Sequence, residues 1–200
     1  MSNLKISEKM KKIIAILAIA LGISAAAVAQ PKAIGGRLGY QTEVSYQHYL
    51  GNPNFLEVTA GLDFNSLAHN DFGFLATATY NFTFAQPNWT DRGTWQWFAG
   101  PGIATGWVND KIVWKPTEGV KETYHPQGFM LGIAGQVGLS YTFWFPLQLS
   151  VSFRPIVGMH ISAPVKEANT GAVLVDSKLN FYDSGITWNW APTLSVHYAF

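Results

Sequence analysis

The sequence predicts an all-β protein: an eight-stranded antiparallel up-and-down transmembrane β-barrel that follows a cleavable signal peptide. Charged residues make up 12% of the 200 positions, whereas ~25% is typical of soluble globular proteins. After residue 29, no apolar run is long enough to cross a bilayer as a helix. Apolar and polar residues instead alternate with a period of two, which is typical of a closed barrel whose outer face meets lipid.

The N-terminal segment predicts export. The first 12 residues carry four Lys and one Glu, the next 11 residues are strictly apolar, and residues 27–29 read Ala-Val-Ala. This order is typical of a secretory signal peptide, and the apolar run is too short for a membrane anchor. We therefore expect cleavage after Ala29, which separates a signal peptide (1–29) from an outer-membrane barrel domain (30–200). Because the chain has no Cys, it can form no disulfide and carry no lipid on a Cys.

The predicted mature chain is close to neutral. It keeps nine basic and eleven acidic residues, so its net charge is near −2. It carries no basic stripe that could meet phosphates, so we expect no nucleic-acid partner. It also lacks the residue spacings of metal and cofactor sites, and we expect neither a metal nor a cofactor.

Seven segments carry the alternation. The first three lie at 33–50, 55–65 and 71–84, and Gly, Asn and Pro in 51–54 supply the turn between the first two. Their apolar faces carry Ile34, Leu38, Val44, Tyr46, Leu56, Val58, Leu62, Phe72, Phe74, Tyr80 and Phe82. Their other faces are rich in Gln, Glu, Ser, Thr and Gly, as expected for strands with one face in lipid and the other in a lumen.

The remaining four segments lie at 94–108, 128–143, 147–159 and 186–200. Their apolar faces carry Trp95, Trp97, Ile103, Trp107, Phe129, Leu131, Ile133, Val137, Leu149, Val151, Trp188, Trp190, Leu194, Val196, Tyr198 and Phe200. Opposite these residues lie mostly Gly, Ala, Ser, Thr and Gln. Small side chains suit a narrow eight-stranded barrel, whose interior is just wide enough for side chains to fill.

An even number of strands requires one segment to be divided. The short connections are 51–54, 85–94 and 144–148, and the long ones are 109–127 and 161–185. Outer-membrane barrels have short periplasmic turns and long external loops. We therefore divide 33–50 into strands at about 33–39 and 43–50, joined by a tight external turn. A rival count keeps 33–50 whole and adds a strand at about 172–182.

The charged residues that we place on strands share the polar face, and they are Arg37, Glu43, Glu57, Asp63 and Arg154. His48 is the ionisable exception on the apolar face. Two basic and three acidic groups in a narrow lumen predict an ion-pair network that plugs the barrel. The rival interpretation is the selectivity filter of a small-solute pore. Eight strands leave no aqueous channel, so the plug is favoured.

Aromatic residues predict the two membrane boundaries. We expect Trp95, Trp97 and Phe200 at the periplasmic rim and Trp107, Trp188 and Trp190 at the outer rim. Amphipathic rings form girdles at both lipid–water boundaries of such barrels.

Histidine residues are the first candidates for chemistry. We expect His69, His125 and His160 in or beside external loops, and His197 in a luminal hydrogen-bond network. A barrel enzyme of the lipid A acyltransferase or deacylase type would place a loop His with Ser and an acid. No catalytic spacing such as H-E-x-x-H is present, so we expect no enzymatic activity. A lipocalin-like binder with its faces inverted is a further alternative, which the shortage of charge disfavours.

Segment 109–127 is the most distinctive loop, with three Lys together with Trp114 and Tyr124. It could bind an extracellular partner, because function tends to lie on loops held by a rigid scaffold. It could equally be a solvated hairpin extension of the strands, and both alternatives stay open.

Three stretches carry a resemblance to a known family: "EVSYQHYLGNPNFLEV", "WQWFAGPGIATG" and "GQVGLSYTFWFPLQLSVSFRP". They resemble segments of the small outer-membrane β-barrel proteins of Gram-negative bacteria, particularly a Bacteroidota-type family akin to OmpX and the OmpA membrane domain. The resemblance implies the cell outer membrane, contact with its lipid and lipopolysaccharide, and assembly machinery that reads the C-terminal strand ending in Phe200. Many relatives have a basic residue before the final Phe, and Ala199 departs from that pattern. The resemblance carries no catalytic motif.

Overall fold

The computed structural model describes residues 31–39, 41–50, 53–63, 73–109, 113–117, 120–124, 127–166, 173–186 and 191–200. The predicted signal peptide and its cleavage site lie outside these residues and stay predictions. Within the described ranges, no helix is long and apolar enough to cross a membrane.

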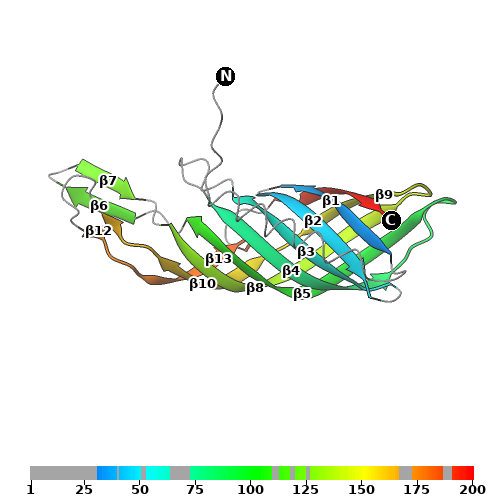
Figure 1. Cartoon of the computed structure of the whole chain (residues 1–200), viewed down its shortest axis with the longest axis horizontal. Helices are drawn as coiled ribbons and strands as arrows, with labels where there is room; N and C mark the ends of the chain where they lie inside the picture. The colour runs from blue at the N-terminus through cyan, green and yellow to red at the C-terminus, as the bar shows by residue number, and fades with distance from the viewer. Residues whose placement is uncertain are drawn as a thin grey trace, which may run out of the picture. The chain divides into compact units, whose positions relative to one another are not determined.

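Eight strands of the described chain form a closed antiparallel ring (Figure 1). In ring order they are β1 (Lys32–Leu38), β2 (Gln41–Tyr49), β3 (Phe55–Asp63), β4 (Phe74–Ala85), β5 (Thr94–Asn109), β8 (Gln127–Thr142), β9 (Leu147–Phe153) and β14 (Thr193–Ala199). Each strand pairs with the next, and β14 pairs with both β9 and β1, which closes the ring. The predicted fold class, an all-β barrel of eight antiparallel strands, is confirmed.

Two walls of the ring are each built from two strand segments. Strand β8 pairs with β9 near one end and with β10 (Ile156–Ser162) near the other. Correspondingly, β14 pairs with β9, whereas β13 (Leu179–Ser184) pairs with β10. Pro155 lies at the first break and Pro192 beside the second, and proline has no N–H to donate to a sheet ladder. The unbroken strands expected at 147–159 and 186–200 are therefore wrong in this respect.

The division of the first segment is confirmed, because β1 and β2 pair as a hairpin with Arg37 opposite Glu43. The rival strand at about 172–182 also has a counterpart, since β13 begins at Leu179. Strand β13 extends the wall that β14 begins, and β1 and β2 remain two separate strands. The expectation that all of 161–185 is a connection is thus wrong, and the alternation of exposed Leu179 and Phe181 with half-buried neighbours marks the strand that it missed.

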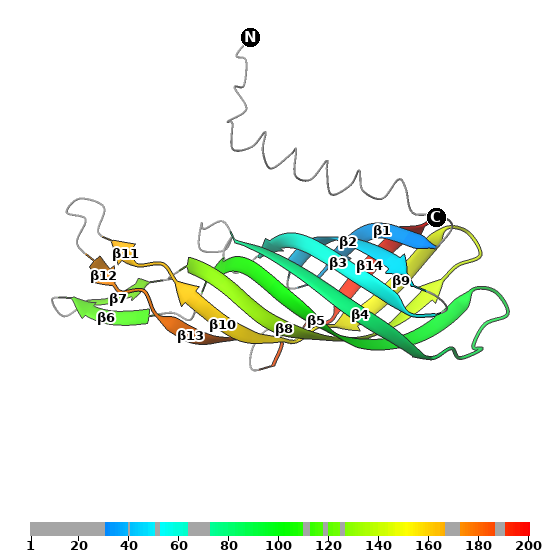
Figure 2. The ribbon, with the colours of Figure 1, turned by 60° about the horizontal axis from the view of Figure 1, so that its bottom comes forward.

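Two smaller antiparallel pairs lie outside the ring (Figure 2). Strand β6 (Val113–Thr117) pairs with β7 (Val120–Tyr124), and β11 (Val165–Lys166) pairs with β12 (Val173–Val175). The β6–β7 pair gives segment 109–127 the hairpin arrangement that one of its two interpretations expected. Its proposed extracellular partner stays a prediction.

Burial alternates along the ring strands as a barrel requires. On β2, the inward Ser45 and Gln47 are buried, whereas the outward Val44 is exposed. On β8, the outward Ile133 is 65% exposed and the inward Gln136 only 4%. The apolar face of the strands therefore points outward and the polar face inward.

Part of the lumen is nevertheless apolar. A buried cluster fills the end away from the chain termini, and its members are Leu75, Ala104, Val108, Met130, Ala134 and Ile156. Phe55 and Phe98 pack edge to face elsewhere inside the barrel, with ring centroids 5.3 Å apart. Gly138 makes room for Phe98, because a Cβ at this glycine would lie 2.5 Å from Phe98 Cζ. The expectation of small and polar inward residues missed these side chains.

Candidate functional site: the luminal charge network

Four charged side chains meet inside the closed part of the ring. Arg37 comes from β1, Glu43 from β2 and Glu57 from β3, and Arg154 follows β9. The two-residue period turns each of them inward, because its chain neighbours occupy the outward face. Their side chains are at most 6% exposed. The stagger of a barrel brings these residues together although 117 positions separate the first from the last.

Arg37 is the centre of the network. Its Nη1 donates to Glu57 Oε2 at 2.7 Å, and its Nη2 donates to Ser152 Oγ at 3.0 Å. Its Nε lies 3.3 Å from Glu43 Oε2. One guanidinium therefore links β1 to Glu43 on β2, to Glu57 on β3 and, across the closure of the ring, to Ser152 on β9.

Glu57 is fully buried and surrounded by donors. Ser45 Oγ donates to its Oε1 at 2.6 Å, and Gln136 Nε2 donates to its Oε2 at 2.6 Å. Gln47 Nε2 adds a longer bond of 3.3 Å. His197 Nε2 lies 2.9 Å from Ser45 Oγ, so β14 also joins the shell around this carboxylate.

The second acidic group, Glu43, pairs with Arg154, whose Nη2 donates to Glu43 Oε1. Thr59 Oγ1 donates to the same oxygen at 3.0 Å and accepts a bond of 3.2 Å from Arg154 Nη1. Thr77 on β4 lies 2.8 Å from Thr59, Oγ1 to Oγ1. Gly61 leaves space here, since a Cβ at that position would lie 2.7 Å from Glu43 Cγ.

The network is electrically balanced, with two guanidinium groups and two carboxylates. Removing a charge from water costs on the order of several kcal/mol per ion. Only close pairing with an opposite charge and further hydrogen bonds can offset this cost. Both conditions hold here, because each carboxylate has an arginine and at least one hydroxyl or amide donor. The arrangement can hold opposite walls together, and its charges are already satisfied by one another.

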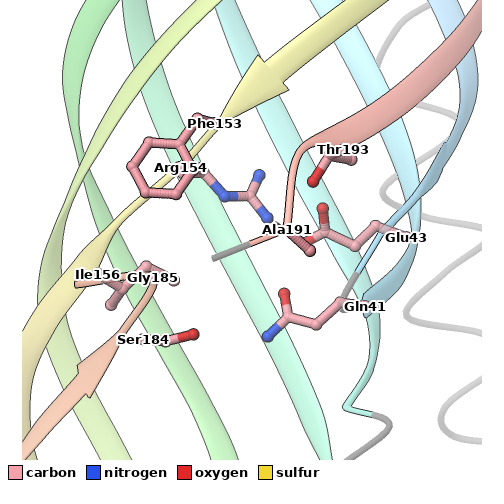
Figure 3. Close-up of a pocket in the computed structure, with 9 residues that line it drawn as sticks. All are labelled: Gln41, Glu43, Phe153, Arg154, Ile156, Ser184, Gly185, Ala191 and Thr193. Atoms are coloured by element: carbon pink, nitrogen blue, oxygen red, sulfur yellow. Dashed lines mark hydrogen bonds and ion pairs between the residues drawn. The ribbon is translucent and has the colours of Figure 1, made fainter. Parts of the chain in front are cut away.

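A small cavity adjoins this network (Figure 3). Its volume is about 30 Å³, enough for about two water molecules. Gln41, Glu43, Arg154, Ser184 and Thr193 supply its polar lining, with Arg154 and Glu43 turned toward each other. The cavity lies where β13 gives way to β14, beside Gly185, whose φ of 83° suits glycine. It has room for water beside the charged groups.

The structure describes only some of the other residues predicted for this network and for the aromatic girdles. Asp63 is the last residue of β3 and lies opposite Gln41, and its side chain is outside the described part of the chain. Trp95 and Trp97 are half-buried on the outward face of β5, and Trp107 is exposed on the same face, donating to Gln127 at 3.2 Å. Phe200 is exposed at the end of the chain, and its backbone exchanges two hydrogen bonds with Lys32. Trp188 and Trp190 lie outside the described residues.

The histidine candidates do not form a site. His69 and His125 lie outside the described residues, whereas His160 is fully buried on β10, with its Nε2 2.9 Å from the carbonyl of Val108. The expectation that His160 lies in or beside an external loop is wrong, because β10 continues to Ser162 and turns this residue inward. Exposed Met159 and Ile161 on either side carry the alternation that could have indicated this. Among the described residues, no group of three or more His, Asp or Glu side chains could hold a metal ion.

Sequence reasoning placed Ser45, Gln136, Ser152 and His197 on the polar face but did not bring them to the charge network. Gln136 and Ser152 lie on strands far from Glu57 and Arg37 in the chain. Only the closure and stagger of the ring decide which luminal residues share one level. No local pattern in the sequence contains that information.

Comparisons with known proteins give a remote structural likeness. Neither a protein-family model nor a curated protein sequence matches the chain. The N-terminal β-barrel domain of Pseudomonas aeruginosa OprF, seen in a crystal structure, is similar with a TM-score of 0.43 and 14% sequence identity. The alignment covers 86% of this chain and 96% of that domain. At this level the assignment of the fold rests on the strand pairing of the chain itself.

Proposed function

We propose that this chain is an integral outer-membrane β-barrel protein without catalytic activity, which acts through its membrane-embedded scaffold and external connections. The apolar outer face of the ring carries this proposal. Large apolar side chains are exposed on every wall, and they include Ile34, Val44, Val58, Phe74, Ile103, Leu131, Ile133, Val151, Met159 and Val196. Water-soluble monomers rarely expose contiguous apolar patches beyond a few hundred Å². A bilayer solvates such a surface.

Two of the ionisable groups at outward positions, Lys32 and His48, lie opposite each other at the rim near the chain termini. The third, Asp183, is half-buried on β13 and lies opposite Val157. At a membrane boundary a half-buried group such as His48 can reach water. The scarcity of ionisable groups on the apolar exterior supports a membrane barrel and opposes the lipocalin-like alternative, which needs a polar exterior and an apolar ligand chamber.

A plugged lumen is the second part of the proposal. The side chains of Arg37, Glu57 and Gln136 connect opposite walls of the ring and leave a cavity of about 30 Å³ beside them. An eight-stranded barrel has an interior just wide enough for side chains to fill. The ion pairs therefore favour a structural or surface-interacting role over a small-solute pore.

The two ends of the ring differ in the length of their connections, which supports an orientation. The short turns 50–54, 86–93 and 143–146 lie at the end that also holds Pro31 and Phe200. The long connections lie at the opposite end. Short turns are periplasmic in outer-membrane barrels. In this proposal the β6–β7 hairpin is displayed outside, lipopolysaccharide surrounds the outer rim, and the assembly machinery contacts the strand that ends in Phe200.

Trypsin treatment of intact cells tests location and orientation together. We expect cleavage within the Lys-bearing segment 109–127 on intact cells, and cleavage after the exposed Arg92 only once the outer membrane is opened. Arg92 is the matched control, because it lies on a turn at the other end of the same barrel. Cleavage after Arg92 on intact cells would reverse the orientation. A chain that stays soluble and folded without detergent would overturn the membrane assignment.

A further inference from the structure

An aromatic cluster occupies two neighbouring turns at the short-turn end of the barrel. Its rings come from the 86–93 turn, the 143–146 turn and the strand ends beside them. Ring centroids lie 5.3 Å apart for Trp89 and Trp95, 4.7 Å for Trp95 and Tyr141, 4.6 Å for Tyr141 and Phe143, 5.9 Å for Phe143 and Trp144, and 4.9 Å for Phe143 and Phe145. Because β5 pairs with β8, the two turns present one continuous surface, which we call the aromatic platform.

A single arginine lies on this platform. The guanidinium carbon of Arg92 is 5.9 Å from the centre of the Trp144 ring, within the range of a cation–π contact. The backbone beside it is fixed, since Tyr141 Oη and Thr90 Oγ1 donate to the Arg92 carbonyl at 2.6 and 2.9 Å. Gly93 completes the turn with a φ of 77°. The exposed guanidinium is therefore held over an aromatic surface by a defined turn.

We propose that the aromatic platform binds a phospholipid, with Arg92 contacting the headgroup phosphate and the exposed rings contacting the glycerol and upper acyl region. This inference rests on the proposed membrane location. Trp144 is 65% exposed, Trp89 58% and Phe145 43%, so their faces are available to a ligand. Tryptophan and tyrosine are the ring types that prefer the boundary between headgroups and hydrocarbon.

The position of the platform favours lipid over a soluble ligand. Trp95 and Tyr141 occupy outward positions of β5 and β8, opposite each other in the ladder. The platform is thus continuous with the apolar outer wall and not with the lumen. A molecule bound there has its apolar part beside the wall and its polar part beside the turn, which is the layout of a phospholipid.

The charge of the platform fits a phosphate. A guanidinium presents several N–H donors in a planar fork that matches phosphate oxygens. Asp91, the chain neighbour of Arg92, is also exposed on this turn, and neither side chain forms an ion pair among the described residues. The cation–π contact places the guanidinium, and not the carboxylate, over the rings.

Native mass spectrometry of the folded full-length mature chain in detergent provides the test. The probes are dioctanoyl phosphatidylglycerol and dioctanoylglycerol, which share acyl chains and differ in the phosphate headgroup. We expect one molecule of dioctanoyl phosphatidylglycerol to bind the wild-type chain about fivefold more tightly than dioctanoylglycerol does. We expect Arg92→Gln to remove most of this difference in affinity. Lys178→Gln is the matched control, because it removes an exposed cation from the opposite end of the barrel and should leave the preference unchanged.

Tyr141→Phe should partly weaken the preference for phosphatidylglycerol, since it removes one of the two hydrogen bonds to the Arg92 carbonyl that fix the turn.

Several results would overturn the inference. These are an equal affinity of the wild-type chain for the two probes, an unchanged preference in Arg92→Gln, or displacement of phosphatidylglycerol by inorganic phosphate or a soluble peptidoglycan fragment at the same concentration. The shift in gel mobility between unheated and boiled samples reports whether each variant has folded. A wild-type chain that folds in detergent and vesicles but shows no headgroup preference contradicts this inference alone. A chain that fails to insert into vesicles contradicts the proposed function itself.

Discussion

Two parts of the barrel interior are filled by different chemistry, although both lie inside one ring. The polar half, built mainly from β1, β2 and β3, holds Arg37, Glu43 and Glu57 with their polar partners. The apolar half, toward the end with the long connections, holds a cluster that includes Val108 and Met130. Paired charges require a specific geometry, whereas apolar side chains tolerate several arrangements of similar volume. We infer that the polar half fixes the register of the ring and the apolar half supplies ordinary core stability.

The largest expected effect comes from removing one charge of the polar half. Glu57→Ala leaves Arg37 buried with Glu43 as its remaining acidic partner and removes the acceptor of Ser45 and Gln136. We expect a loss of about 3–5 kcal/mol in the free energy of unfolding. Urea titration of the barrel in phospholipid vesicles, followed by tryptophan fluorescence, measures this loss.

Glu57→Gln is the control for that experiment, because it keeps side-chain size and one acceptor oxygen while it removes the charge. We expect the Gln variant to lose less stability than the Ala variant. If Glu57→Ala unfolds within about 1 kcal/mol of the wild type, the polar half does not hold the ring together and the comparison between the two halves fails.

A second expected effect concerns the apolar half. Met130→Ala removes a fully buried side chain from the cluster and leaves a cavity, which costs about 3 kcal/mol in the same titration. Leu131→Ala, the next position on β8, is the matched control because Leu131 is 57% exposed on the outward face. Fluid lipid can fill the space that this second change leaves. Equal losses for the two variants would mean that the interior is not packed as a core.

Period two was sufficient to predict which face of each strand points inward, whereas the requirement for an even number of strands divided β1 from β2 correctly. It also placed Arg37, Glu43 and Glu57 on the inner face. It could not show that Ser152 or Gln136 reaches those charges, because the stagger that aligns distant strands is a property of the closed ring. The predicted end of the strand was wrong at His160, because the alternation continues to Ser162, beyond the point at which we expected a loop. The break between β13 and β14 was missed as well, although Pro192 lies beside it.

The smallest expected effect compares two buried serines on paired strands of the polar half. Ser152 Oγ accepts a bond of 3.0 Å from Arg37, whereas Ser195 Oγ has no hydrogen-bond partner among the described residues. Ser152→Ala therefore removes an acceptor from a buried cation and should cost about 1–2 kcal/mol. Ser195→Ala removes a buried hydroxyl that satisfies nothing there, and should leave the free energy of unfolding unchanged or slightly higher. Both changes delete the same atom beside the closure of the ring, so their difference in urea midpoint isolates the bond to Arg37. Equal losses would show that packing, and not the charge network, decides how this seam is held.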